Sequence, residues 1–241
     1  MIRPNEVTEH RNDISRFMVH LTRDDSDEWK SGGGSARKNF LSIFRERRIM
    51  ATNPHCLHAN RVGDSLRKKL KVSCFSEMPL NAIRHATKPI KGRKIQLEPY
   101  GFVFSREFIL ENGGQEVTYV NSYGANKLVR EGYDKVFEIA KKGKFKGEMW
   151  KVLPFLSAMH ERCDFHWERE FRILGDLKFK RSNLICVILP EEGLGPFKFS
   201  LAQKGVAWIS TGWGYEKIVE KLADQQRRTK RLKSEKLAVC D

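Results

Sequence analysis

Two glutamates, Glu168 and Glu170, lie two residues apart in the segment FHWEREFRIL at residues 165–174. The segment alternates apolar and polar residues, which predicts a β-strand whose residues i and i+2 share a face. Arg172 continues the polar face and can pair with either carboxylate. Such a pair has two interpretations. In the first, the glutamates belong to a salt-bridge ladder on an exposed strand, where each ion pair adds little stability. In the second, one glutamate is a general base and the other stabilises developing positive charge.

Polar side chains also lie near the ends of two other predicted strands. His20 and Thr22 lie two residues apart at the end of the apolar run RFMVHLT, so they share a face. The run KVSCFSEMP contains Ser73 and ends near Ser76 and Glu77. Taken singly, these features are typical of a hydrogen-bonded strand-end histidine and of a serine turn. Their order along the chain is what suggests a common site.

Known phosphate-binding and nucleophile motifs are absent from the sequence. It contains no GxxxxGK[ST], no GxGxxG after a strand and no GxSxG. The glycines at residues 32–34 lie in a polar link, which favours a flexible connection. Two clusters contain residue types that bind metals. The first is His160, Cys163 and His166, and the second is His55, Cys56 and His58. Neither has the tight CxxC or HxxxH spacing of zinc sites, so we expect no metal.

The chain is strongly basic, which favours a polyanion as partner. Its 241 residues include 45 Lys and Arg against 30 Asp and Glu, a net charge of +15. A surplus of this size attracts nucleic acid first, and anionic membranes or acidic proteins next. The alternative is that these charges form ordinary solvated faces. Candidate nucleic-acid-binding residues are Lys88, Lys91, Arg93 and Lys94 in one basic segment and Arg227, Arg228, Lys230 and Arg231 in the other.

The same composition gives expectations about location. No apolar run approaches the ~18 residues of a membrane span, and the N-terminal residues lack the apolar core of a secretory signal. Five cysteines at irregular spacing are typical of reduced thiols rather than of a disulfide framework. We therefore expect a cytoplasmic protein without a membrane partner.

The periodicity of the sequence predicts the elements that position these residues. Short apolar runs predict strands at residues 16–22, 71–76, 100–105, 116–121, 165–174, 184–190 and 206–211. Helical spacing predicts a helix after Ser35 that carries Phe40, Leu41, Phe44 and Ile49, and a last helix from Tyr215. Residues 50–69 show little periodicity and are expected to form a loop.

Two more helices are expected within residues 126–162, the second marked by Trp150, Leu153, Leu156 and Met159. Because the helices are bunched rather than alternating with strands, the pattern favours an α+β fold over a doubly wound parallel sheet. We expect a single domain over residues 1–226, with a helical insertion at about 126–162 and a basic tail at 227–241.

Several of these motifs, in this order, resemble a known enzyme family. The His-x-Thr at residues 20–22, followed by the FLSIFRERRI helix, resembles the opening of DarT-type ADP-ribosyltransferases. The pattern V-x-x-F-x-x-x-P, here Val72, Phe75 and Pro79, is similar to their next core strand. The run at 169–173 is similar to the strand that carries their catalytic glutamate. With YGFVF and the W-x-x-E-x-R strand, the layout also resembles the AbiGi group of abortive phage-infection proteins.

The resemblance implies an ADP-ribosyltransferase fold, a split and mostly antiparallel sheet pair with inserted helices, here followed by a basic C-terminal helix. It implies NAD as a substrate, with Glu170 stabilising the cationic ribose and Glu168 assisting the acceptor. The cofactor-binding residues it implies are His20 and Thr22 for a ribose, Ser73 and Tyr100 for the nicotinamide pocket, and Arg61 or Arg67 for the cofactor-contacting arginine. Residues 76–79, Ser-Glu-Met-Pro, depart from the proline- and arginine-rich strand exit of DarT.

By the same resemblance, the chain is expected to be the toxic effector of an anti-phage or toxin–antitoxin system, with a cognate antitoxin or regulatory protein. The basic charge favours nucleic acid as the acceptor. The alternative is a non-catalytic module that retains the fold and binds nucleic acid or another polyanion, or acts as an antitoxin. A nuclease would need a metal-binding carboxylate cluster, and the sequence contains none that is convincing. The acceptor and the oligomeric state stay open.

Overall fold

The computed structural model describes residues 14–24, 34–52, 56–89, 96–123, 127–159 and 166–238, with side chains described as far as residue 227. The chain divides into two compact units. Unit 1 comprises Met1–Arg47, Met78–Phe108 and Phe179–Asp241, and unit 2 comprises Arg48–Glu77 and Ile109–Lys178. The single domain expected over residues 1–226 stays a prediction, and each unit is described by itself.

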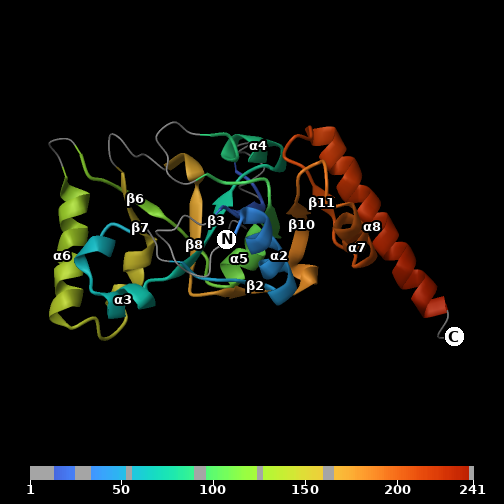
Figure 1. The fold of residues 1–241 in the computed structure, drawn as a ribbon. Helices are drawn as coiled ribbons and strands as arrows, with labels where there is room; N and C mark the ends of the chain where they lie inside the picture. Colours follow the sequence, from blue (N-terminus) through green and yellow to red (C-terminus); the bar gives the residue numbers. More distant parts are fainter. Residues whose placement is uncertain are drawn as a thin grey trace, which may run out of the picture. The chain divides into compact units, whose positions relative to one another are not determined.

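Unit 1 contains a four-stranded sheet whose strand order is β11-β10-β4-β1. The strands are β1 (Phe17–Leu21), β4 (Gly101–Ser105), β10 (Leu184–Ile188) and β11 (Trp208–Ile209). Strand β4 pairs antiparallel with β1 and with β10. Strand β10 pairs parallel with β11, and both are labelled in Figure 1. Four of the strands predicted from apolar runs therefore form one sheet.

Strand β4 fits closely against β1 because its first residue is glycine. Gly101 lies opposite Leu21, and a Cβ atom at Gly101 would lie 2.5 Å from the backbone oxygen of His20. The next three residues of β4, Phe102 to Phe104, are fully buried. A strand buried on both faces reads as a continuous apolar run, as this one does.

The helices of unit 1 follow the capping signals of the sequence. Helix α2 (Ala36–Glu46) begins after Ser35, whose hydroxyl accepts a hydrogen bond from the Lys38 amide, the usual N-cap arrangement. The helix ends at Arg47 in a left-handed conformation with φ 54°. This stop excludes Ile49 from the helix that was expected to include it, and Ile49 lies in strand β2 instead.

The described part of unit 1 contains several further helices. They are η3 (Leu80–Ala82), α4 (Ile83–Ala86), η6 (Arg181–Asn183), α7 (Gly195–Gln203) and α8 (Tyr215–Ala238), while α5 (Arg106–Glu111) spans the boundary between the units. Residues of β1, β4, β10, β11, α4 and α8 share one buried apolar cluster. Helix α8 contributes Ile218 to this cluster, as its predicted apolar face requires.

Unit 2 contains a three-stranded antiparallel sheet with the strand order β3-β8-β5. Its strands are β3 (Val72–Glu77), β8 (Glu170–Leu174) and β5 (Gln115–Glu116). Two short pairs accompany it: β2 (Arg48–Ile49) lies antiparallel to β9 (Leu177–Lys178), and β6 (Thr118–Asn121) lies parallel to β7 (Leu156–Met159).

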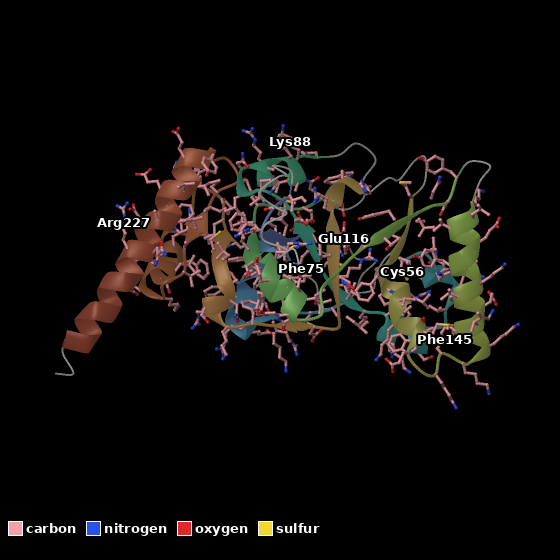
Figure 2. The ribbon with its side chains drawn as sticks, turned by 180° about the vertical axis from the view of Figure 1, so that it is seen from behind. Cys56, Phe75, Lys88, Glu116, Phe145 and Arg227 are labelled. Atoms are coloured by element: carbon pink, nitrogen blue, oxygen red, sulfur yellow. The ribbon has the colours of Figure 1, made fainter. Side chains whose placement is uncertain are left out.

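The helices of unit 2 are η2 (Ala59–Arg61), α3 (Asp64–Lys69), α6 (Leu128–Lys142), η4 (Met149–Phe155) and η5 (His166–Glu168). A second apolar cluster joins α3, α6 and η4. Cys56 and Phe145, both labelled in Figure 2, belong to this cluster, Cys56 as a buried member and Phe145 packed against it.

Three sequence expectations about unit 2 are wrong. The second helix within residues 126–162 is a 3-10 helix, η4, followed by strand β7, because Pro154 removes a helical donor. Residues 50–69 contain η2 and α3 rather than an open loop. Strand β8 begins only at Glu170, because Arg169 has φ 43° and His166–Glu168 form η5.

The fold class is α+β with mostly antiparallel strand pairing, as predicted. The described residues form eleven strands rather than about seven, because two-residue strands such as β5 and β11 are too short to show a period. No helix within the described ranges is long and apolar enough to cross a membrane.

Candidate active site

The two faces of the unit 2 sheet differ sharply in polarity. The antiparallel register places Cys74 opposite Arg172 and Ser76 opposite Glu170, and directly opposed residues share a face. The other face carries Phe75 and Phe171, which are both buried and lie opposite one another. The polar face therefore gathers a thiol, a hydroxyl, a carboxylate and a guanidinium on two adjacent strands.

Arg172 is the centre of the polar face and holds Glu170 in a two-point contact. Its Nε donates to Glu170 Oε1 at 3.0 Å and its Nη2 to Glu170 Oε2 at 2.7 Å. The Arg172 side chain is 4 % exposed and that of Glu170 is 13 % exposed. This pair is therefore not the exposed ladder that one interpretation of the sequence predicted.

Two further contacts fix the guanidinium from a segment earlier in the chain. Nη1 of Arg172 donates to the Pro154 carbonyl oxygen at 2.5 Å, and Nη2 donates to the Ser157 hydroxyl at 2.9 Å. Burial lowers the pKa of Arg172, but the charge of Glu170 and its hydrogen bonds outweigh this, so the net change is a raised pKa. A buried arginine with this set of partners stays charged and immobile.

Glu168 does not share a strand face with Glu170, because it lies in η5, before the strand begins. The two carboxylates nevertheless act on the same groups. Burial is the largest cause of the raised pKa of the Tyr119 hydroxyl, and the charges of both glutamates raise it further. Both also contribute to the raised pKa of Cys74, for which burial is again the largest cause. The shared strand face expected for the two glutamates is therefore replaced by a turn between η5 and β8.

The turn between the two glutamates is strained and anchored. Arg169 adopts a left-handed conformation with φ 43°, which is unfavourable for a residue with a side chain. Its Nη2 contacts Glu77 Oε1 at 3.1 Å, and the Glu77 side chain is 3 % exposed. The Glu77 amide also donates to the Arg169 carbonyl oxygen. Strand β3 therefore holds the backbone immediately before Glu170.

Tyr119 of β6 brings a buried hydroxyl to this neighbourhood. Its ring lies edge-on to His166, with 5.7 Å between the ring centroids. Within the described ranges, the buried Tyr119 oxygen has no hydrogen-bond partner. A buried hydroxyl without a partner costs about 1–3 kcal/mol. Such an atom is a candidate for contact with a ligand.

Of the predicted cofactor-binding residues, three lie in unit 1. His20 lies in β1 opposite Phe102. Thr22 follows the strand and is buried, and its hydroxyl lies 2.9 Å from the Ala36 carbonyl oxygen and 3.1 Å from that of Tyr100. Since a hydroxyl has one proton to donate, Thr22 is committed to holding the start of α2 beside Tyr100.

The other three predicted cofactor-binding residues, Ser73, Arg67 and Arg61, lie in unit 2, where each contacts another part of the protein. The Ser73 hydroxyl is buried and donates to the Gly175 carbonyl oxygen at 2.8 Å. Arg67 donates to the Ala59 carbonyl oxygen. Arg61 forms ion pairs with Asp134 at 2.7 Å and Glu138 at 2.6 Å, and its guanidinium lies 4.5 Å from the Phe137 ring centroid. Arg61 therefore joins η2 to α6.

The predicted nucleic-acid-binding residues are only partly described. Lys88, after α4, and Arg227, on α8, are both exposed (Figure 2). Lys91, Arg93 and Lys94 lie outside the described residues. Arg228, Lys230 and Arg231 lie in the helical backbone of α8, but their side chains are outside the described set.

Sequence reasoning placed Glu77 in the same candidate site but missed Tyr119, Cys74 and Ser157 as neighbours of the glutamates. The predicted strand faces could have paired Cys74 with Arg172, had the antiparallel register of β3 and β8 been known. Nothing local indicates the roles of Tyr119 and Ser157. Of the metal-ligand groups in the sequence, His55, His160 and Cys163 lie outside the described residues, and the described residues hold no group of three or more His, Cys, Asp or Glu suited to a metal.

No protein-family model, curated protein or solved structure matches the chain.

Proposed function

We propose that this chain transfers ADP-ribose from NAD, or cleaves NAD, and that nucleic acid is the acceptor. Cleavage breaks the bond between the nicotinamide nitrogen and the ribose carbon, and positive charge develops on the ribose. A fixed carboxylate beside the ring accepts a hydrogen bond from the 2′-hydroxyl and stabilises that charge. Glu170 is the carboxylate we assign to this role. The role of toxic effector in an anti-phage or toxin–antitoxin system, with a restraining partner protein, belongs to the same proposal.

The observation that carries the proposal is the immobilisation of Glu170 by Arg172. Electrostatic stabilisation is effective only when the charged group does not need to reorganise during the reaction. The two contacts from Arg172, at 3.0 and 2.7 Å, supply that rigidity. Each carboxylate oxygen retains a second acceptor site, so Glu170 can still accept a hydrogen bond from a substrate hydroxyl.

Two neighbouring features support the same assignment. Arg169, directly before Glu170, has a strained backbone, and such strain is concentrated at functional sites. The buried Tyr119 hydroxyl has no partner among the described residues, and both glutamates influence it electrostatically. A substrate that hydrogen-bonds Tyr119 would therefore be subject to the charge of both carboxylates. His20, Thr22, Ser73, Tyr100, Arg61 and Arg67 stay candidates for binding NAD.

The test is incubation of the protein with NAD labelled in its adenylate phosphate, together with DNA, RNA and cell protein. We expect label in nucleic acid and release of nicotinamide. The Glu170→Gln variant should lower nicotinamide release by about 100-fold or more, since loss of one preorganised electrostatic group has that effect. Gln retains an acceptor for Arg172, and thermal unfolding monitored by circular dichroism shows whether the variant is folded.

The matched control is Glu116→Gln, which makes the same chemical change on the adjacent strand β5. Glu116, labelled in Figure 2, is exposed. It lies opposite Phe171 in the strand register and so on the other face from Glu170. This control should keep wild-type activity. Glu168→Gln should lower transfer of label more than release of nicotinamide, because Glu168 is assigned to the acceptor. Wild-type nicotinamide release in a folded Glu170→Gln variant would refute the proposal.

The second candidate function is non-catalytic binding of nucleic acid or another polyanion. The observation that favours it is the exposed basic character of α8, where the Arg227 side chain is 81 % exposed. This function predicts salt-dependent binding of nucleic acid that is the same in wild type and in Glu170→Gln, with no consumption of NAD.

A further inference from the structure

A cluster of lysines and tryptophans lies in unit 1, where β11 leads into α8. Trp208 is the first residue of β11 and is half-buried, and Trp213 lies between this strand and α8. Their ring centroids lie 4.8 Å apart, and Trp213 belongs to the apolar cluster of this unit. The two rings therefore form a rigid platform that is part of the core.

Three ammonium groups lie against this platform. Nζ of Lys198, on α7, lies 4.2 Å from the Trp208 ring centroid, and Nζ of Lys221, on α8, lies 5.1 Å from the same centroid. Nζ of Lys217 lies 4.5 Å from the Trp213 centroid. We call these five residues the Trp208 cluster. Its cations come from two helices that β11 brings together (Figure 1).

The positive charge of the cluster is only partly balanced. Lys217 forms an ion pair with Glu191 at 2.7 Å. Lys198 donates to the backbone carbonyl oxygens of Pro190 and Glu191, which are neutral acceptors. Among the described residues, Lys221 has no carboxylate within ion-pair distance. One carboxylate thus faces three ammonium groups.

The two cations beside Trp208 repel one another. Burial is the largest cause of the lowered pKa of Lys198; Glu191 opposes this change and the charge of Lys221 adds to it. An anion bound between Lys198 and Lys221 would relieve the repulsion. The geometry of two ammonium groups held against one ring therefore suits an anionic ligand.

We propose that the Trp208 cluster binds backbone phosphates of nucleic acid. The ammonium groups already occupy positions over the tryptophan rings, so the rings hold the lysines in place and are not available for stacking with bases. Binding through such a cluster is electrostatic and independent of base sequence. The site does not depend on ADP-ribosyl transfer, and it supplies a docking surface for a nucleic-acid acceptor if that transfer occurs.

The arrangement of α8 favours nucleic acid over a membrane surface. A membrane-binding helix places apolar side chains between its basic ones, at the same surface. The exposed apolar residues of α8 near the lysines are Tyr215 and Val219. Each lies two positions before a lysine, Lys217 or Lys221, and two positions correspond to a rotation of about 200° around the helix. On α8, Lys217 and Lys221 therefore lie on a different flank from these two apolar side chains.

The test measures binding of a fluorescein-labelled oligonucleotide by anisotropy, at several salt concentrations. Lys221→Gln removes a side chain whose described contact is the ring of Trp208, so the fold should be unaffected. It should reduce the slope of log affinity against log salt by about 1, and the double variant Lys198→Gln/Lys221→Gln by up to about 2, with affinity lowered about tenfold or more at low salt.

The control is Lys141→Gln/Lys142→Gln, which removes the same charge from exposed positions on α6 in unit 2. It should bind oligonucleotide as wild type does. Equal slopes for wild type and Lys221→Gln would overturn the proposal. It would also be overturned if the lysine variants lost binding only to vesicles containing phosphatidylserine. Nicotinamide release measured without nucleic acid should be the same in Lys221→Gln and wild type, which separates this site from the outcome of the NAD assay.

Discussion

At the scale of single residues, the decisive contact is the buried pair of Glu170 and Arg172. Removing two charged groups from water is costly, and their attraction offsets the cost only when the geometry is good and the remaining donors are satisfied. Arg172 meets this condition through Pro154 and Ser157. The pair therefore gives unit 2 little net stability, but it fixes the orientation of one carboxylate.

This view predicts an asymmetric response to mutation. Arg172→Met should lower the free energy of unfolding by about 3–5 kcal/mol, because it leaves the Glu170 carboxylate without its partner in a largely buried position. Urea denaturation measures the loss. The double variant Glu170→Met/Arg172→Met should recover most of the stability, since apolar replacement of a buried pair is often neutral.

The double variant should nevertheless release no nicotinamide, because it lacks the carboxylate. Lys178→Met, at an exposed position of β9, is the control and should change stability by less than about 0.5 kcal/mol. A loss of less than about 1 kcal/mol in Arg172→Met would contradict the idea that the pair is buried and interdependent.

At the scale of elements, α6 is held to η2 by a polar network around Asp134. His58 is fully buried, its Nε2 lies 2.9 Å from Asp134 Oδ1, and its ring stacks on Phe137. Arg61 and Arg130 pair with the same carboxylate. Burial raises the pKa of Asp134, but its hydrogen bonds to His58 and Arg130 outweigh this and lower it overall.

The network predicts a loss of stability on mild acidification. Burial lowers the pKa of His58 below its ordinary value of 6.5; Asp134 opposes this change, and Arg61 and Arg130 add to it. The unfolded chain therefore binds more protons than the folded chain as pH falls below 6.5. Stability from the neutral His58 is fully present above pH 6.5 and is lost progressively below it.

Urea denaturation between pH 7.5 and 5 should show this decrease in wild type. The decrease should be smaller in His58→Gln, which retains a donor toward Asp134 but does not titrate. The contribution of Asp134 is lost only as pH falls below about 4, near its ordinary pKa of 3.8, and so lies outside this window. Equal pH dependence in the two proteins would rule out His58 as the titrating group.

The elements also show which sequence signals are reliable. The capping serine of α2 and the apolar runs of β1, β3, β4 and β10 predicted real elements, because these signals act within a few residues. The helical spacing around Trp150 predicted a helix that is a 3-10 segment and a strand. There, Pro154 and pairing with β6 outweighed the apolar period.

At the scale of the whole molecule, the net charge of +15 is the dominant property. A charge of this size acts on association with polyanions rather than on the fold. Six basic residues of the C-terminal segment contribute to it: Arg227, Arg228, Lys230, Arg231, Lys233 and Lys236.

Removal of residues 227–241 should therefore weaken nucleic-acid binding and reduce its salt dependence. The slope of log affinity against log salt should fall by about 1 for each phosphate that the shortened chain no longer neutralises. A full-length variant with the six basic residues changed to Gln should behave in the same way, which separates charge from chain length. An unchanged slope in both proteins would assign the binding to other surfaces, such as the Trp208 cluster.

The sequence by itself determined the net charge, the α+β class and the elements with strong local signals, because composition, capping and periodicity are properties of neighbouring residues. It also singled out Glu170 and Arg172. Only the tertiary structure decided what surrounds them. The partners Pro154, Ser157, Cys74 and Tyr119 come from other segments of the chain. Burial and pairing depend on which distant segments pack together, and local periodicity does not encode that choice.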